Sequence, residues 1–208
     1  MKGSIGRDLS RHYYYGQPFL NLYERSDNMR IISGKYRGRV LKGFDIEGTR
    51  PTMDRVKESL FAMIQDQVKE SICLDLFAGS GNLGIEALSN GAKECYFVDH
   101  NKFATKTMKE NMTTLKLEHD DHILTMDYMD ALHYFERQQI QFDIVFLDPP
   151  YGMNVISPIL SYIIDHHLLT DKGIIICEYE KEEPTNNQLT LWKERKYGSK
   201  KIRIYRNC

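Results

Sequence analysis

Short apolar runs alternate with longer segments of mixed polarity along most of the chain. Five runs have the length of β-strands, at residues 72–77, 95–98, 122–126, 142–147 and 173–177. Each of the first four is followed by a segment whose apolar residues lie three and four apart, which predicts a helix. These segments are residues 83–89, 103–115, 131–135 and 155–166. Strands without polar alternation are covered on both faces, so the pattern predicts an α/β fold with a parallel sheet between helices.

The two ends of this region show a different pattern. Residues 189–192 and 202–205 alternate between apolar and polar positions and are joined across a Tyr-Gly turn, which predicts two further strands that pair antiparallel. The sheet is therefore expected to have seven strands, mostly parallel, with an antiparallel C-terminal strand. Before the sheet, residues 30–43 alternate around Gly34 and Gly38, which predicts an N-terminal β-hairpin with a basic turn.

A helix pattern follows the hairpin, with apolar residues spaced through 56–64 and Thr52 as the predicted N-cap. Residues 1–28 show neither period, and we interpret them as a leader or disordered extension. An aromatic arm that stacks on RNA is the alternative. We therefore divide the chain into this leader, a basic hairpin at 29–48 and one α/β domain at 49–208, because 208 residues suffice for one full domain but not for two large ones.

Composition narrows the class of protein. No apolar run approaches the roughly 18 residues of a membrane helix, and the first residues lack the apolar region of a secretory signal. The four cysteines lie far apart without a Cys-x-x-Cys pair, which predicts free thiols in a reducing compartment and hence a cytoplasmic protein. None of the seven histidines falls in a metal-binding spacing, so we expect no metal.

The near-zero net charge hides an uneven distribution. Residues 30–57 carry a net charge of +5 and residues 193–206 a net charge of +6, whereas residues 58–192 carry −13. An acidic body with two basic ends suits an enzyme that binds a polyanion, since phosphate contacts supply affinity. Charge alone leaves open the alternative that both ends are ordinary solvated surfaces.

Four acids end or closely follow four consecutive predicted strands. They are Asp75, Asp99, Asp127 and Asp148. In an open α/β sheet, ligands bind beyond the carboxyl ends of the strands, at the point where the strand order reverses. We therefore expect these carboxylates to surround one ligand. Any single aspartate at such a position can instead be a turn or N-cap residue, so the prediction rests on the set.

The sequence DLFAGSGNLG at residues 75–84 places a glycine-rich turn between a strand and a helix. Its Gly-x-Gly-x-x-Gly pattern also occurs in nicotinamide-binding proteins, where a diphosphate lies on the helix N-terminus. A cationic sulfonium cofactor instead needs acids nearby, which Asp75 and Asp148 supply, so the surroundings favour S-adenosylmethionine over NAD. Asp99 has the spacing of an acid that binds ribose hydroxyls, and Asp127 beside Tyr128 could accept from an adenine amino group.

The sequence DPPY at residues 148–151 predicts the reaction. An exocyclic amine on a nucleobase is a poor nucleophile, because its lone pair is delocalised into the ring. If the Asp148 carboxylate and the Pro149 carbonyl each accept one N–H, the lone pair is directed at a methyl donor and the developing charge is stabilised. The prolines keep these acceptors in place before substrate binds, and Tyr151 could stack on the base. A proline-terminated strand with a surface tyrosine is the structural alternative.

Three motifs resemble those of one known family. They are TRPTMDRVKESLF at 49–61, DLFAGSGNLGIEAL at 75–88 and FLDPPY at 146–151, and they are similar to the RsmD-type family of bacterial 16S rRNA (guanine-N2) methyltransferases. MRIISGKYRGR at 29–39 and YGSKKIRIY at 197–205 also resemble the ends of that family. The resemblance thus covers residues 29 to about 206. The first motif discriminates best, because many amino-methyltransferases share the other two.

The resemblance implies a Rossmann-like class I methyltransferase that uses S-adenosylmethionine to methylate N2 of one guanine in 16S rRNA. The catalytic residues would be Asp148, Pro149, Pro150 and Tyr151. The cofactor would contact Asp75, Phe77, Ala78, Gly79, Ser80, Gly81, Asn82, Asp99, His100, Asp127, Tyr128 and Asp148. The RNA would contact Arg30, Lys35, Arg37, Arg39, Lys42, Arg50, Thr52, Arg55, Lys200 and Lys201. The chain has His100 where the family commonly has a second charged residue, which leaves the adenine contacts open.

The resemblance also implies partners. Family members act on partly assembled small ribosomal subunits, so we expect 16S rRNA within such a particle as the substrate, with no membrane partner and a monomeric enzyme. Two other functions remain open on the residues alone. One is an N6-adenine methyltransferase of DNA or RNA, which would use the same Asp-Pro-Pro-Tyr chemistry. The other is a non-catalytic RNA-binding protein of the same fold, although such a protein would be expected to lose the acid at the amine site.

Overall fold

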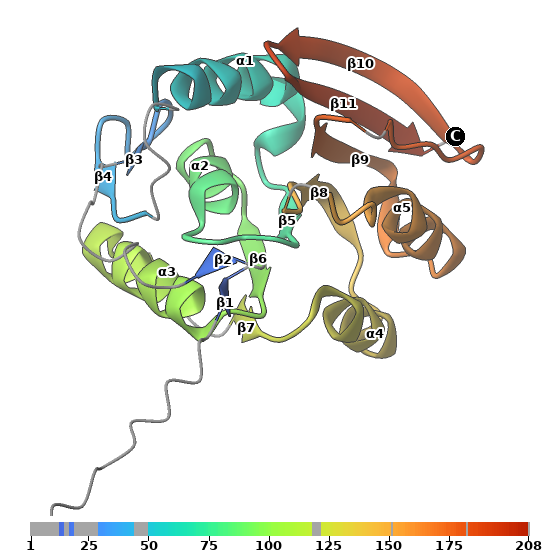
Figure 1. The fold of residues 1–208 in the computed structure, drawn as a ribbon, viewed down its shortest axis with the longest axis horizontal. Coiled ribbons are helices and arrows are strands. Elements are labelled where there is room, and N and C mark those ends of the chain that lie inside the picture. The colour runs from blue at the N-terminus through green and yellow to red at the C-terminus, as the bar shows by residue number, and fades with distance from the viewer. Residues whose placement is uncertain are drawn as a thin grey trace, which may run out of the picture.

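The computed structural model describes residues 13–14, 17–18, 29–43, 50–117, 122–150, 152–181 and 183–207, and for residues 13–14, 17–18 and 50–53 it describes the backbone only. Its helices and strands are, in chain order, β1 (Tyr13–Tyr14), β2 (Gln17–Pro18), β3 (Met29–Arg30), β4 (Val40–Leu41), α1 (Arg50–Val68), β5 (Ile72–Asp75), α2 (Asn82–Ser89), β6 (Glu94–Asp99), α3 (Lys102–Leu115), β7 (Ile123–Thr125), α4 (Tyr128–Gln138), β8 (Phe142–Leu147), α5 (Ile156–Asp165), β9 (Leu169–Tyr179), β10 (Leu189–Tyr197) and β11 (Lys200–Asn207). Figure 1 shows the helices arranged around the central sheet.

Seven strands of the described residues form the central sheet, in the order β10-β11-β9-β8-β5-β6-β7. The five strands from β9 to β7 are parallel, and β11 pairs antiparallel with both β9 and β10. The predicted α/β class, the mostly parallel seven-stranded sheet and the antiparallel C-terminal strand are therefore confirmed. The chain runs outward from β5 to β7 and then returns to β8 on the other side of β5. The strand order thus reverses between β5 and β8, where an open sheet binds its ligands.

Two hydrophobic layers hold the helices on the sheet. On one face, Ile64 of α1, Ile85 of α2 and Met108 of α3 belong to one buried cluster. On the other face, Phe135 of α4 and Ile163 of α5 belong to a second. Successive strand residues point to opposite faces, so each parallel strand contributes to both clusters, as its uninterrupted apolar sequence predicts. Figure 1 shows α1, α2 and α3 on one side of the sheet and α4 and α5 on the other.

Some element boundaries differ from the prediction. Helix α1 begins at Arg50, so the prediction of Thr52 as N-cap is wrong. Pro51 lies in the first turn instead, where a proline is favoured because the N–H that it lacks would have no partner within the helix. Strand β9 begins at Leu169, four residues before the predicted run. The apolar pattern misses this first part of the strand because residues 170–172 are polar and two of them are exposed.

The N-terminal hairpin predicted around two glycines is confirmed as the antiparallel pair β3–β4. Gly34 has φ +77°, and a Cβ on it would lie 1.9 Å from the carbonyl oxygen of Ser89, so only glycine fits here. The close approach lets the backbone N–H of Lys35 donate to that oxygen at 2.7 Å. The hairpin is thereby attached to the last turn of α2, and its Ile31 and Leu41 are fully buried in the cluster beneath α1, α2 and α3.

A buried ion pair joins the hairpin to two helices. Lys57 Nζ of α1 lies 2.9 Å from Glu86 Oε2 of α2, and these side chains are 5% and 0% exposed. The same ammonium donates to the carbonyl oxygen of Arg30 and to Asn82 Oδ1, both at 2.8 Å. The Glu86 carboxylate accepts from the backbone N–H groups of residues 32–33. Because each charge is hydrogen-bonded on several sides, the pair tolerates complete burial.

The described residues contain free cysteines but neither a membrane-spanning helix nor a metal-binding cluster. Cys73, Cys95 and Cys177 are buried free thiols, and Cys208 lies outside the described residues. No helix in the described part of the chain is both long and apolar enough to cross a membrane. The same residues contain no group of three or more His, Cys, Asp or Glu side chains that could hold a metal ion.

Replacing Glu86 by alanine is expected to lower the free energy of unfolding by about 3–5 kcal/mol, because the Lys57 ammonium and the hairpin N–H groups would remain buried without their acceptor. Urea titration measures this change. The control is Glu110→Ala, which removes the exposed pair with Lys42 and should change the free energy of unfolding far less, because solvent screens that pair. Equal effects of the two substitutions would contradict the structural role of the buried pair.

Candidate functional site

Three acids meet where the sheet reverses its strand order. Asp75 is the last residue of β5, Asp99 is the last residue of β6, and Asp148 directly follows β8. Strand β5 lies between the other two strands, so Asp75 lies between Asp99 and Asp148. The negative charge of Asp75 contributes to the raised pKa of Asp148, and that of Asp99 to the raised pKa of Asp75. Three of the four acids that the sequence places at strand ends are therefore neighbours in the structure.

Asp75 holds the start of α2 against the end of β5. Its side chain is buried, and Oδ2 accepts from the backbone N–H of Gly84 at 2.9 Å. Burial raises the pKa of Asp75 to about 7, the charge of Asp99 adds to the rise, and the bond from Gly84 opposes it. Loss of solvation is the main cause, because a carboxylate inside the protein loses more from desolvation than one backbone N–H returns.

Asp99 holds the glycine turn from the other side. Its Oδ2 accepts from the backbone N–H of Gly79 at 2.9 Å, and its Oδ1 accepts from the backbone N–H of Asn101 at 2.8 Å. Burial raises the pKa of Asp99, and these two bonds oppose the rise. Within the turn, Gly81 has φ +87°, and a Cβ on it would lie 2.9 Å from Ile85, so this position requires glycine. The turn is therefore fixed by two carboxylates and one close packing contact.

These two carboxylates differ from Glu86 in their neighbours. Asp75 and Asp99 are only 2% and 3% exposed, and among the described residues neither has a Lys or Arg within ion-pair distance. The imidazole of His100 lies beside Asp99, with Nδ1 3.9 Å from Asp99 Oδ1. Buried carboxylates without a cation are costly unless a positive charge arrives. The arrangement therefore suits a cationic ligand and disfavours a diphosphate.

The remaining predicted cofactor residues fall into two groups. Phe77 and Tyr128 lie beside the turn with ring centroids 5.4 Å apart, and His100 is exposed near Asp99. Asp127 is exposed and caps α4, since Oδ1 accepts from the backbone N–H of Met129 at 2.9 Å. These residues form the outer part of the same edge.

Ala78, Ser80 and Asn82 have bonds that hold the turn itself. The N–H of Ala78 donates to the carbonyl oxygen of Val98, and the carbonyl oxygen of Ser80 accepts from Asn111 Nδ2. The side-chain oxygen of Asn82 accepts from Lys57. A ligand at this edge would therefore contact the backbone of the turn more readily than the Asn82 amide, whose oxygen is already bonded to Lys57. The sequence pattern does not show which of these two groups is available.

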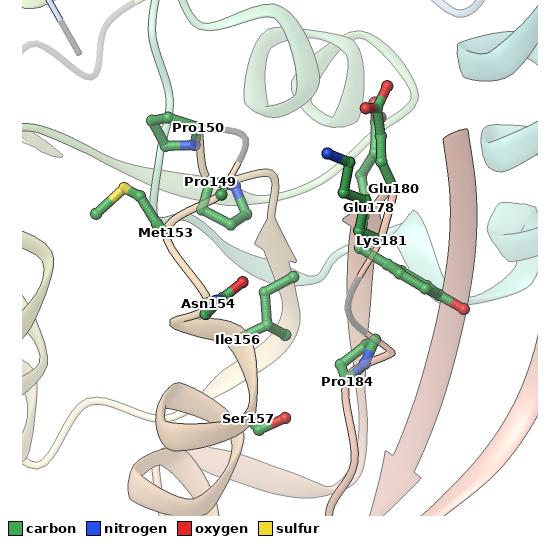
Figure 2. Close-up of a pocket in the computed structure, with 12 residues that line it drawn as sticks. Pro149, Pro150, Met153, Asn154, Ile156, Ser157, Glu178, Glu180, Lys181 and Pro184 are labelled. Atoms are coloured by element: carbon green, nitrogen blue, oxygen red, sulfur yellow. The ribbon is translucent and has the colours of Figure 1, made fainter. Parts of the chain in front are cut away.

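Pro149 and Pro150, which directly follow Asp148, line a pocket of about 610 Å³. Figure 2 shows Pro149 and Pro150 on one side of this pocket and Glu178 on the opposite side. The start of α5 and the segment after β9 complete its walls. Burial raises the pKa of Asp148 well above its usual value, the charge of Glu178 adds to the rise, and Lys200 opposes it. Tyr151 lies outside the described residues.

Sequence reasoning missed Glu178. Its carboxylate forms an ion pair with Lys200, with side-chain exposures of 12% and 22%. Glu178 directly follows the apolar run predicted as the fifth strand, as Asp148 follows the fourth, so the rule that selected four acids at strand ends would have found it too. The glutamate-rich segment at residues 180–183 follows it closely and resembles a solvated loop, which makes the end of the strand hard to recognise in the sequence.

The predicted RNA-binding residues do not form one surface. Arg30, Lys35, Arg37, Arg39, Lys42 and Arg55 are exposed, and all but Arg55 belong to the hairpin region. Lys42 is paired with Glu110 at 2.7 Å, and Arg30 lies 3.7 Å from Asp54. Lys200 and Lys201 are instead partly buried and paired with Glu178 and Glu183. The side chains of Arg50 and Thr52 lie outside the described residues. The hairpin turn is thus the main exposed basic feature among these residues.

Comparison with known proteins gives consistent matches over the same region. Residues 29–206 match the family described as Conserved hypothetical protein 95. The chain is 40% identical to "Ribosomal RNA small subunit methyltransferase D" of Haemophilus influenzae, over 86% of this chain and 94% of that protein. It is 32% identical to the protein of the same name from Escherichia coli, over 86% of this chain and 90% of that protein.

Solved structures share the fold. The structure titled "Putative methyltransferase yhhF from Escherichia coli" superposes with a TM-score of 0.75 at 30% sequence identity. The match covers 86% of this chain and 98% of that one. The sheet, the glycine turn and the pocket described above therefore lie within the part of the chain that these proteins share.

Replacing Asp75 by asparagine is expected to change how stability depends on pH. Unfolded Asp75 ionises near pH 4, whereas folded Asp75 keeps its proton up to about pH 7. Unfolding between these values releases a proton, so raising the pH destabilises the wild type. The asparagine variant keeps the acceptor for Gly84 without the charge, and above pH 7 it should be more stable by up to about 4 kcal/mol. Urea titrations from pH 4.5 to 8 measure this difference, and a difference that does not change with pH would contradict the account.

Proposed function

Because the chain belongs to the Conserved hypothetical protein 95 family, we propose that it is an S-adenosylmethionine-dependent methyltransferase of 16S rRNA in the small ribosomal subunit. These matches confirm the family that the three sequence motifs predict. We further propose that the methylated atom is the exocyclic N2 of a guanine. The position of Asp148 beside Asp75, with Pro149 lining a pocket, supports an exocyclic amine as the methyl acceptor, and the resemblance of the three sequence motifs to guanine-N2 methyltransferases supports guanine as the base.

The residues around the glycine turn fit the cofactor. When bound, S-adenosylmethionine supplies an electrophilic methyl group on a positively charged sulfur. We assign Asp75 and Asp99 to its charged and hydroxyl groups, because both are buried acids at adjacent strand ends. The backbone of Ala78, Gly79, Ser80 and Gly81 lets it approach closely. Phe77, His100, Asp127 and Tyr128 would surround the more exposed adenosine part, and Asn82 would contribute only its backbone.

Asp148 and Pro149 prepare the amine. The Asp148 carboxylate and the Pro149 carbonyl accept one N–H each, which directs the nitrogen lone pair towards the glycine turn and Asp75. The carboxylate must be ionised to do this, and two nearby charges act on its pKa in opposite directions, Glu178 raising it and Lys200 lowering it. A cation bound beside Asp75 would lower it further. Pro150 keeps the segment rigid, and Tyr151 is proposed to stack on the base.

The basic residues of the hairpin are proposed to bind the rRNA backbone. They are Arg30, Lys35, Arg37, Arg39 and Lys42, with Arg50, Thr52 and Arg55 at the start of α1 and Lys200 and Lys201 near the pocket. We propose that the enzyme is a cytoplasmic monomer and that its substrate is an assembling small subunit. The names of the similar proteins from Haemophilus influenzae and Escherichia coli support small-subunit rRNA as the substrate.

Replacing Asp148 by asparagine is expected to lower kcat for methyl transfer to small-subunit RNA by about 100-fold or more, since the amine would lose a charged acceptor and meet an N–H donor. Cofactor affinity, measured by calorimetry, should remain within about threefold, because the main partner of Asp148 is the amine. Asp165→Asn, at an exposed position that ends α5, serves as the control. Near-normal turnover by the Asp148 variant would refute its role.

Reversing the charge of Lys35, Arg37 and Arg39 is expected to weaken RNA binding and to reduce the slope of log affinity against log salt by about 2, because roughly three phosphate contacts would be lost. Binding is measured at several salt concentrations with 16S rRNA. The control reverses Lys69, Lys93 and Lys172, which are exposed near the amino ends of the strands, away from the site. If both triple variants show the wild-type slope, the hairpin is not part of the RNA interface.

A further inference from the structure

Glu178 lies beside Asp148 at the ends of two neighbouring strands. Leu147 of β8 is in register with Cys177 of β9, so the residues that follow each of them are neighbours across the two strands. In a parallel pair, residues in register point to the same face of the sheet, and adjacent strands lie about 4.8 Å apart. Two carboxylates at this spacing can reach neighbouring donors on one planar ligand.

The surroundings keep Glu178 in place. Its Oε1 accepts from Lys200 Nζ of β11, and Ile202 of β11 is in register with Glu178. Both charged side chains are largely buried, which makes the pair less sensitive to solvent screening than a surface pair. Each carboxylate oxygen can accept more than one hydrogen bond, so the bond to Lys200 leaves Glu178 acceptor capacity on the pocket side.

The edges of the purine bases differ at the atom next to the amine. Guanine carries an N–H at N1 beside its 2-amino group, so it presents adjacent donors. Adenine carries an acceptor at N1 beside its 6-amino group. The 2-amino group of guanine is flanked by N1 and N3. If Asp148 and Pro149 accept the two amine hydrogens and N1 lies on the side of β9, N1–H is directed towards Glu178, which follows Cys177 on that strand.

We propose that Glu178 accepts a hydrogen bond from N1–H of the target guanine and thereby makes the enzyme specific for guanine over adenine. The inference rests on the proposed function and adds to it the residue that selects the base. A purine without a hydrogen at N1 would place an acceptor against a partly buried carboxylate, which leaves both groups unsatisfied. Lys200 acts as a positioning residue, since its ammonium group holds the Glu178 carboxylate in place through their ion pair.

The test uses a base that keeps the 2-amino group and lacks the hydrogen at N1 together with the 6-oxo group of guanine. In 2-aminopurine the 2-amino group is present, but N1 is an acceptor without a hydrogen. The full-length enzyme is assayed on small-subunit RNA that carries either guanosine or 2-aminopurine at the position where the wild type places its methyl group. The variants are Glu178→Gln, Glu178→Asp and the control Asp165→Asn, at an exposed acid that ends α5 and does not line the pocket.

The wild type is expected to prefer guanosine by at least ~100-fold in kcat/KM, the order expected when a buried polar group loses its partner. Glu178→Gln should reduce this preference to about tenfold or less and methylate 2-aminopurine, because the glutamine amide can donate to N1. Glu178→Asp keeps the charge and should keep the preference at a lower kcat/KM, and Asp165→Asn should behave as the wild type.

Two outcomes overturn the inference while leaving the proposed function intact. One is a wild type that methylates guanosine and 2-aminopurine equally well. The other is a folded Glu178→Gln variant that keeps the full preference or loses activity on both substrates. If that variant does not fold, Glu178→Asp decides, and loss of the preference in it overturns the inference. A wild type that does not methylate guanosine at all overturns the proposed function, and this inference with it.

Discussion

The placement of the site depends on buried carboxylates at the ends of adjacent parallel strands. Asp75 and Asp99 fix the glycine turn by accepting from the backbone N–H groups of Gly84 and Gly79. Their charge is not offset by a Lys or Arg among the described residues, and burial raises the pKa of both. When they ionise, these buried carboxylates therefore carry a desolvation cost beside the turn. A cationic cofactor recovers that cost on binding, which gives the site a preference that glycine spacing alone cannot supply.

Two other largely buried acids, Glu86 and Glu178, each pair with a lysine, but the two pairs have different roles. Glu86 meets Lys57 in a closed network that joins the hairpin to α1 and α2, so it serves the framework. Glu178 meets Lys200 at the edge of a pocket, beside Asp148, so its charge remains available to a ligand. The lysine that pairs with Glu86 gives its other hydrogen bonds to Arg30 and Asn82, whereas the acid that pairs with Lys200 lines the pocket. Only the second is placed to select a base.

Much of the fold could be predicted from the sequence, because strand length and apolar continuity directly reflect burial on both faces. The run at 142–147 coincides with β8, and the four acids at strand ends fall at the carboxyl edge of the sheet. The prediction failed where tertiary contacts decide. The start of α1 at Arg50 rather than after Thr52 depends on the first-turn proline, and the bond from Lys57 to the Asn82 amide follows from packing that no local pattern encodes. Glu178 was missed because a glutamate-rich segment follows it, although its position after an apolar run is the same signal that identified Asp148.

The account depends on a rigid pair of acceptors, Asp148 and the Pro149 carbonyl, that hold an exocyclic amine of a guanine. The most direct measurement is the identity of the modified nucleoside. Small-subunit particles that lack methylation, or naked 16S rRNA, are incubated with the protein and labelled S-adenosylmethionine, then digested and examined by mass spectrometry. The account predicts N2-methylguanosine as the labelled product. Label in N6-methyladenosine, or no label in RNA under conditions where the protein binds the cofactor, would contradict it.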